Sequence, residues 1–567
     1  MINWYGLFTN SLWIIGAALL LASLSWSLYA ATLARNGWRA QLKSPDFTLA
    51  SAAGMTLLML GLGFQRGTPL WQSALWFMLA LAFVLLAWLA WREHLGVPTD
   101  VKALARTQIS GVRGMAIGLI LLGALLAAMY AFTIRPWMQP DEPRHYEVAQ
   151  HDARLGRPGA NYGDVNLDWE RELIADMEAQ NFWWYGYSVT GWDPNNLPQS
   201  FEEIWEPRYS RAFFQLPLYY DMAGLLLYTW GDDLSLSQSV MLLRFFGILW
   251  LILSLGGIYA IGRELFPKHP QIALGALAFA ALWPAHLAAN AAVNNDPMAE
   301  ALVIWTTFFA VRLLRRGPNF RTLTWFFLLT ILSIYTKRTA FSVLALLLTI
   351  PLWGALQIGR NASRRSRIVG AAMLIGGVAA IPALLFIIQA TGKYWLSTSV
   401  LENASFAKAW TLVAAAPLGK FLLSLYRTFW GWFGWLRVPL PGFIYWAGAI
   451  ITVGLVALLI LGYLQIITKK LAAWQKAALA LLLLTLITQL GLTLGKDIIY
   501  GDWKGGSTPQ IRYLFPVLPA ILTPIFLGAQ RIMPASRRSL ALATLIVSLL
   551  IFNFYILAFI LYPFFWL

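Results

Sequence analysis

The feature that most limits how this chain can fold is its succession of apolar segments of membrane-spanning length. A helix needs about 20 apolar residues to cross the hydrocarbon core of a bilayer, and only a helix or a closed barrel satisfies its backbone hydrogen bonds there. The pattern predicts an all-α polytopic membrane protein with about fourteen transmembrane helices. The expected spans are 10–33, 47–65, 70–92, 113–134, 240–262, 270–290, 298–315, 321–336, 340–357, 367–390, 441–466, 475–495, 511–531 and 538–562.

Composition agrees with this class. Of the 567 residues, 59% are hydrophobic and only 12% are charged, whereas soluble domains carry about 25% charged residues. The chain has no cysteine, which excludes disulfides and thiolate metal sites. The N-terminal sequence MINWYGLFTNSLW has no basic residue before the first apolar run, so a cleaved signal peptide is not expected.

The formal net charge of +16 has a topological explanation. Short loops on one side of the expected helices are strongly basic, and they include 312-RLLRR-316, 360-RNASRRSR-367 and Lys469–Lys470. Cytoplasmic loops of membrane proteins are enriched in Lys and Arg, so these loops are expected inside the cell and both termini outside. Nucleic-acid binding is not expected.

With this topology, two long segments, 135–239 and 391–440, lie on the outer side of the membrane. Within the first, 214-FQLPLYYDMAGLLLYTWG-231 is apolar but short and carries Asp221. If it crossed the bilayer, every later basic loop would change side. We therefore expect an interfacial helix there, with Tyr and Trp at headgroup level.

Unusual polar residues occur at four separate places that this topology assigns to the same outer leaflet. Charges beside a bilayer are costly and are usually functional, so we expect one cavity built from helix ends. The residues are Asp141, Glu142, Arg144 and His145 in 139-QPDEPRHYEVAQ-150, Asn294, Asn295 and Asp296, Lys337 and Arg338, and Arg512.

These residue types suit phosphate-ester chemistry. Asp141 or Glu142 can act as a general base, while Arg144, Lys337 and Arg512 can hold a phosphate. A carboxylate facing such cations describes transfer of a group from a phosphate ester to a hydroxyl. The base takes the proton of the acceptor, and the cations stabilise the leaving phosphate.

Each residue also has a structural interpretation. Asp141 and Asp296 can cap helices, Glu142 can form an ion pair with an arginine, and Arg144 can reach headgroup phosphates. Lys337, Arg338 and Arg512 can anchor helices at the interface. These alternatives remain open at the level of sequence.

Two further patterns are less specific. His145, His151 and Asp152 offer metal-ligand types without wider spacing support, and no metal is predicted. The aromatic run 182-FWWY-185 favours interface packing over a sugar platform, although aromatic stacking on sugars is physically reasonable.

Several motifs, in order, resemble those of the C-type (GT-C) membrane glycosyltransferases, which use polyprenyl-phosphate-linked sugars. The most similar branch is the uncharacterised DUF2142-like membrane proteins. The motifs span 113–531 and are PDEPRHYEVA, LPLYYDMAGLLLY, 244-RFFGILWLILSLGGIYAIGRELF-266, 290-NAAVNNDPMAEAL-302, 335-YTKRTA-340, 430-WGWFGWLRVPLP-441 and 510-QIRYLFPVLP-519. The Asp-Glu-x-Arg pattern at 141–144 also resembles that of the lipid A aminoarabinose transferases.

The resemblance implies a role for two site residues, and the roles expected of the others follow from their residue types and positions. The leading acid of the first outer loop is the expected base, which is Asp141 here, and the arginine three positions later, Arg144, is an expected phosphate contact. Lys337 and Arg512 complete the expected phosphate site. Glu142, His145, Asn295 and Asp296 are expected to orient the acceptor or the cations.

The chain departs from the GT-C pattern at its start. The acidic motif normally follows the first transmembrane helix, and here it follows the fourth. Residues 1–112 therefore resemble an added three-helix membrane module that can bind a protein partner, while 113–567 resemble the transferase domain. The chain ends at 562-YPFFWL-567, and no soluble acceptor-binding domain is expected.

The sequence thus predicts an inverting glycosyltransferase of a bacterial plasma membrane with its active site on the outer side. Its donor would be a polyprenyl monophosphate sugar, and no cofactor or metal is expected. Two other classes remain: a transporter or flippase of a lipid-linked anion, and a non-catalytic subunit of a membrane complex. Few polar groups occur at mid-depth in 240–262 and 367–390, which disfavours transport.

Overall fold

The computed structural model describes most of the chain. The described residues are 3–33, 41–68, 111–185, 196–205, 212–358, 418–500 and 509–567, except 43, 214 and 469, with scattered positions within 72–87 and at 368 and 371. The expected span 367–390 lies outside these ranges almost entirely, and 70–92 does so in large part. The loop 391–417 also lies outside them.

Helices dominate the described residues, as the apolar pattern predicts. Ten of them are long and apolar enough to cross a bilayer, and a bent pair supplies an eleventh if it is counted as one span. The helix at 320–336 is apolar but shorter. The class of all-α polytopic membrane protein is therefore confirmed, while the count of fourteen spans stays a prediction.

The chain divides into two compact units. The first comprises the described residues of Met1–Ser110, Tyr146–Leu167 and Tyr220–Ser239. Its start corresponds to the module expected at 1–112, but it also takes two pieces of the loop expected at 135–239. Its elements are α1 (Trp4–Leu33), α3 (Pro45–Gly63), η1 (Tyr162–Asp164), η2 (Gly231–Asp233), and most of α7 (Glu142–Leu155) and α11 (Leu218–Trp230).

Small residues allow α1 and α3 to pack closely. A Cβ atom added at Gly16 would lie 2.5 Å from the backbone nitrogen of Leu58, and one at Gly61 would lie 2.6 Å from that of Trp13. Such close backbone approach is typical of helix pairs in membranes. The expected interfacial segment 214–231 contains α11, which has 13 residues and is therefore too short to cross a bilayer as a helix.

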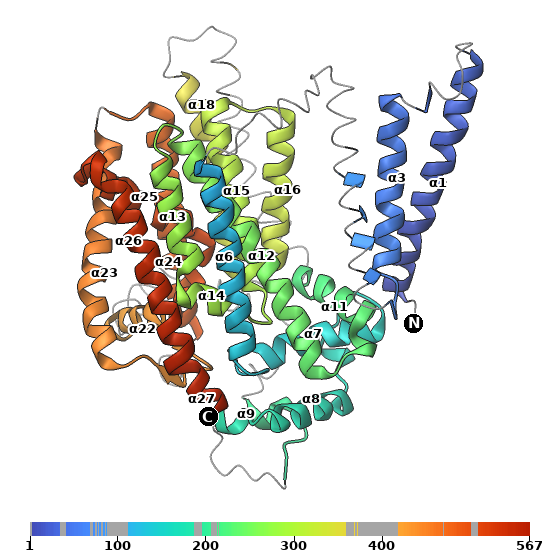
Figure 1. Ribbon diagram of the computed structural model, residues 1–567, viewed down its shortest axis with the longest axis horizontal. Helices are drawn as coiled ribbons and strands as arrows, with labels where there is room; N and C mark the ends of the chain where they lie inside the picture. Colours follow the sequence, from blue (N-terminus) through green and yellow to red (C-terminus); the bar gives the residue numbers. More distant parts are fainter. Residues whose placement is uncertain are drawn as a thin grey trace. The chain divides into compact units, whose positions relative to one another are not determined.

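The second unit comprises Gly111–His145, Asp168–Tyr219 and Val240–Leu567. In Figure 1 its long helices α6, α13, α15, α24, α25 and α26 run side by side. The elements are α6 (Gly111–Thr133), α8 (Leu167–Ala179), α9 (Phe182–Tyr185), α10 (Phe201–Ile204), α12 (Leu236–Leu265), α13 (Pro270–Leu282), α14 (Pro284–Asn290), α15 (Asp296–Arg316), α16 (Phe320–Thr336), η3 (Arg338–Ser342), α17 (Val343–Leu346), α18 (Thr349–Ile358), α22 (Leu418–Trp430), α23 (Gly442–Tyr463), η4 (Leu464–Ile467), α24 (Ala473–Tyr500), η6 (Ile511–Val517), α25 (Leu518–Ile532), η7 (Ala535–Arg537), α26 (Arg538–Tyr555), η8 (Ile556–Leu561) and α27 (Tyr562–Trp566).

The expected span 270–290 is broken. Pro284 lacks an N–H group, so it cannot donate to the carbonyl of Ala280, and the chain bends by 63° between α13 and α14. The Nδ1–H of His286 donates to that carbonyl instead, at 2.8 Å. Its Nε2 lies 2.8 Å from Glu300 Oε1 on α15. His286 therefore satisfies the carbonyl that Pro284 cannot bond and links α14 to α15.

Candidate functional site

Asp141 lies where the chain leaves α6 and begins α7. Its φ is +69°, the left-handed region, which Asp tolerates better than most residues. Its carbonyl accepts a hydrogen bond from the N–H of His145 at 3.1 Å, so Asp141 occupies the N-cap position. Its carboxylate is instead bonded to Arg144 and to Arg512. The capping interpretation therefore holds for its backbone but not for its side chain.

Ion pairs bring together four distant parts of the chain. Arg512 Nη2, in η6, lies 2.5 Å from Asp141 Oδ2, and Arg512 Nε lies 3.7 Å from Asp296 Oδ2. Lys337 Nζ, between α16 and η3, lies 2.5 Å from Asp296 Oδ1. We call Asp141, Arg144, Asp296, Lys337 and Arg512 the charged cluster.

Exposure differs across the charged cluster. The side chain of Asp141 is 27% exposed and that of Arg144 is 16% exposed. Asp296, Lys337 and Arg512 are exposed by 10% or less. Asp141 is therefore the member of the charged cluster that solvent or a substrate reaches most easily.

His145 is buried beside the charged cluster, at 5% exposure. Burial lowers the pKa of His145 well below its ordinary value, and the nearby charges of Lys337 and Arg144 lower it further. The imidazole is therefore neutral near pH 7 and adds no charge to the cluster.

Glu142, expected as a catalytic or orienting acid, is fully buried away from solvent. Its Oε1 accepts from Arg244 Nε at 2.8 Å and from the N–H of Val293 at 3.1 Å, and its Oε2 accepts from Arg244 Nη2 at 2.7 Å. The geometry matches the structural ion pair that the sequence left open.

Arg244 is a residue that sequence reasoning did not single out for the site. Beyond Glu142, it donates to the carbonyls of Ala131, Ile134 and Arg135 at 2.7, 2.5 and 2.8 Å. All five of its N–H donors are therefore used. An arginine inside the apolar helix α12 was the available signal, since a buried cation requires a partner.

The asparagines beside Asp296 support the backbone. Asn294 Oδ1 accepts the N–H of Asp296 at 2.5 Å, and Asn295 Nδ2 donates to the carbonyl of Thr336 at 3.4 Å. The second bond ties the start of α15 to the residue preceding Lys337. Asn295 thus lies behind the charged cluster and holds two of its segments together.

Two tryptophans that were not predicted hold Arg144. Its guanidinium carbon lies 5.3 Å from the ring centroid of Trp205 and 5.9 Å from that of Trp435, within cation–π range. Trp435 has φ +51° and follows the short strand β1 (Trp432–Phe433), which pairs with β2 (Val438–Pro439). Its Nε1 donates to the carbonyl of Trp137 at 3.0 Å.

The aromatic run 182–185 is divided between packing and exposure. Phe182 and Trp183 are buried, and Phe182 packs edge-on against Trp205 and Trp435. Trp184 is 77% exposed. The packing interpretation thus describes the first two residues of the run.

One member of the charged cluster, Arg512, lines a small cavity of about 50 Å³, and the other four members do not. Its lining includes Gln139 and Pro140, and Thr428, Trp432, Phe433 and Gly434. Four alanines in and after α14 also line it: Ala285, Ala288, Ala289 and Ala292. The alanines leave space beside the guanidinium that larger side chains would fill.

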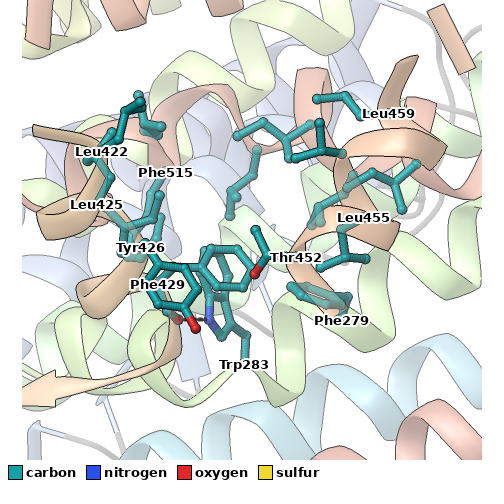
Figure 2. Close-up of a pocket in the computed structure, with 17 residues that line it drawn as sticks. Phe279, Trp283, Leu422, Leu425, Tyr426, Phe429, Thr452, Leu455, Leu459 and Phe515 are labelled. Atoms are coloured by element: carbon teal, nitrogen blue, oxygen red, sulfur yellow. Dashed lines mark hydrogen bonds between the residues drawn. The ribbon is translucent and has the colours of Figure 1, made fainter. Parts of the chain in front are cut away.

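A second cavity, of about 240 Å³, has an almost wholly apolar lining (Figure 2). Phe279, Leu425, Phe429 and Leu455 point into it in the close-up, from α13, α22 and α23. Ile511 and Phe515 line both cavities. An apolar space therefore borders the space beside Arg512.

The alternative metal site is not assembled in the described part of the chain. His151 Nδ1 lies 2.9 Å from the carbonyl of Glu147, and its Nε2 accepts the N–H of Asn166 at 3.2 Å. Both ring nitrogens thus serve the backbone. Among the residues that the structure describes, no group of three or more His, Asp or Glu side chains is placed to hold a metal ion.

Comparison with known proteins gives a family for the chain. Curated proteins yield no match. Residues 213–521, more than half of the chain, match a family described as predicted membrane protein (DUF2142). Within that range lie Arg244, Asp296, Lys337 and Arg512, whereas Asp141 and its neighbours precede it. The chain therefore belongs to the DUF2142 family of predicted membrane proteins.

Proposed function

We propose that the protein is an inverting glycosyltransferase that moves a sugar from a polyprenyl monophosphate donor to an acceptor hydroxyl. The observation that carries the proposal is the charged cluster. An accessible carboxylate, Asp141, is paired with two arginines, and Lys337 is paired with Asp296, which lies 3.7 Å from one of these arginines. An apolar cavity borders the space beside Arg512. A lipid with a phosphate head needs such neighbours: cations for the phosphate and an apolar space for the chain.

The residues divide the reaction between them. Asp141 accepts the proton of the acceptor hydroxyl, and the hydroxyl oxygen attacks the anomeric carbon. The bond from that carbon to the phosphate oxygen breaks, and its electron pair stays on the phosphate. Arg144, Lys337 and Arg512 stabilise the charge that develops there. Attack opposite the leaving group inverts the anomeric centre.

The lipid chain would occupy the apolar cavity of Figure 2. Its polar head would then enter the smaller cavity at Arg512, since Ile511 and Phe515 border both. A monophosphate carries less charge than a diphosphate, so the proposed donor does not require a metal ion to neutralise it. Positioning of the two substrates supplies much of the rate acceleration.

The orientation of helix α15 supports an outer-face site. α15 begins at Asp296 in the charged cluster and ends at Arg315 and Arg316, which pair with Glu264 at the end of α12. Basic ends of membrane helices face the cytoplasm. The charged cluster, at the opposite end of the same helix, would then face outward in a plasma membrane.

A turnover assay with matched variants tests the proposal. Proteoliposomes are supplied with radiolabelled polyprenyl-phosphate hexoses and pentoses, and sugar release and transfer are measured. We expect Asp141→Asn to lower turnover by at least about 100-fold, the scale of general-base catalysis. Asp168→Asn is the control, because the Asp168 side chain is 81% exposed, and it should stay within about twofold of wild type. Equal turnover in the two variants would remove Asp141 as the base.

A further inference from the structure

Both oxygens of the Asp141 carboxylate are engaged by arginines. Oδ1 is bonded to Arg144 and Oδ2 lies 2.5 Å from Arg512 Nη2. Bonds to the charged form of a carboxylate favour that form. In this arrangement Asp141 is therefore a poor proton acceptor, although the proposed function requires it to accept a proton.

The same two arginines are the proposed phosphate ligands. Guanidinium groups bind carboxylates and phosphates through the same N–H donors. A phosphate at Arg144 and Arg512 and the carboxylate of Asp141 thus compete for one set of donors.

The charges of the cluster permit such an exchange. Arg144, Lys337 and Arg512 supply three positive charges, and Asp141 and Asp296 supply two negative charges. The neutral His145 adds none. The cluster therefore carries one net positive charge, which a singly charged phosphodiester neutralises. A polyprenyl-phosphate sugar is a phosphodiester of this kind.

The side chains of Asp141 and Arg144 differ in the contacts that hold them in place. Arg144 also lies within cation–π range of the rings of Trp205 and Trp435. Within the part of the chain that the structure describes, the Asp141 side chain is bonded to the two arginines, and it is the most exposed member of the cluster. When an anion takes the arginine donors, Asp141 is thus free to turn away while Arg144 stays.

We propose that Asp141 is an internal competitor for the phosphate site, and that binding of the donor phosphate displaces its carboxylate from Arg144 and Arg512. The inference rests on the proposed function and deepens it. The donor itself releases the base, so the donor binds before the acceptor is activated. Hydrolysis is thereby limited, because the base is not free until the donor phosphate is in place.

The first test is the affinity for farnesyl monophosphate, measured with the full-length protein in detergent by native mass spectrometry. Asp141→Asn removes the competing charge but keeps a side chain of the same size. We expect the dissociation constant of this variant to be about tenfold lower than that of wild type. Asp168→Asn should bind like wild type.

A second test uses wild-type protein alone and does not depend on a variant folding. A water-soluble carbodiimide with an amine labels accessible carboxyl groups, and peptide mapping reads the label at Asp141. We expect faster labelling of Asp141 when farnesyl monophosphate is saturating, with Asp296 unchanged.

The outcomes separate this inference from the proposed function. Weaker binding by Asp141→Asn, or labelling of Asp141 that is unchanged or slower with the probe, would show that Asp141 is a fixed support of the arginines and overturn the inference alone. No binding of farnesyl monophosphate to wild type would overturn both the inference and the proposed phosphate site.

Discussion

At the scale of single residues, the proposed site depends on where a few charges are fixed. Asp141 has a left-handed backbone, and its side chain lies between Arg144 of its own helix and Arg512. Non-glycine residues held in this region often mark functional sites. The same chain turn buries Glu142 on Arg244. Adjacent acids therefore have different environments, and only the first is reachable.

A pair of carboxyl groups in the first unit, the buried Asp152 and the half-buried Asp221, gives a prediction about pH. Asp152 Oδ1 accepts the N–H of Ala160 at 2.6 Å, and Asp221 Oδ1 accepts that of Gly159 at 3.1 Å. Burial, with the nearby carboxylate of Asp221, raises the pKa of Asp152 from 3.8 to about 8. Between these pH values the folded protein holds the proton and the unfolded chain does not, so stability falls as pH rises through this window.

We therefore expect Asp152→Asn, which imitates the protonated side chain, to flatten this dependence. The apparent melting temperature in detergent is measured from pH 5 to pH 8 for wild type, Asp152→Asn and the exposed control Asp168→Asn. Wild type and the control should lose stability toward pH 8 relative to Asp152→Asn. Identical slopes for all three proteins would show that Asp152 is already ionised.

At the scale of elements, the Arg244–Glu142 pair joins four segments. It connects α12 to the end of α6, to the start of α7 and, through Val293, to the turn before α15. Asp141 and Asp296 lie on two of these segments. The pair therefore sets the spacing of the two acids in the charged cluster.

Replacing only one partner of this ion pair should destabilise the protein more than replacing both partners. Glu142→Gln leaves the buried charge of Arg244 uncompensated, a loss of about 3–5 kcal/mol for pairs of this kind. Adding Arg244→Met to that variant should recover part of the apparent melting temperature. Additive losses in this double-mutant cycle would contradict a direct coupling between the two side chains.

Elements also show what the sequence could and could not reveal. Hydropathy located the ten described helices of membrane-spanning length, and loop charge predicted that Asp141, Asp296, Lys337 and Arg512 come from one end of the helices. Neither hydropathy nor loop charge revealed the partner of Arg244, because an ion pair between residues about a hundred positions apart depends on how the helices pack. Nor did these patterns predict that Trp205 and Trp435 hold Arg144. In the sequence, these two residues cannot be distinguished from tryptophans that lie at the membrane interface.

At the scale of the whole molecule, the second unit places three features next to one another. These are the charged cluster, the small cavity at Arg512 and the apolar cavity lined by α13, α22, α23, η6 and α25. Each feature alone has an ordinary structural explanation. Their adjacency is what favours a lipid-linked phosphate ligand over a purely structural role.

The variants for the decisive measurement come from α23. Val456 lines the apolar cavity, so Val456→Trp should fill it. Val453, on the same helix, is 71% exposed and does not line the cavity, so Val453→Trp is the matched control. Arg512→Gln removes the cation that lines the small cavity.

Native mass spectrometry of protein purified from its own membranes tests the central claim most directly, because it identifies any lipid that remains bound. We predict that wild type and Val453→Trp carry a polyprenyl monophosphate or its glycosylated form, and that Val456→Trp and Arg512→Gln carry much less. Absence of such a lipid from wild type, or equal amounts in all four proteins, would contradict the account.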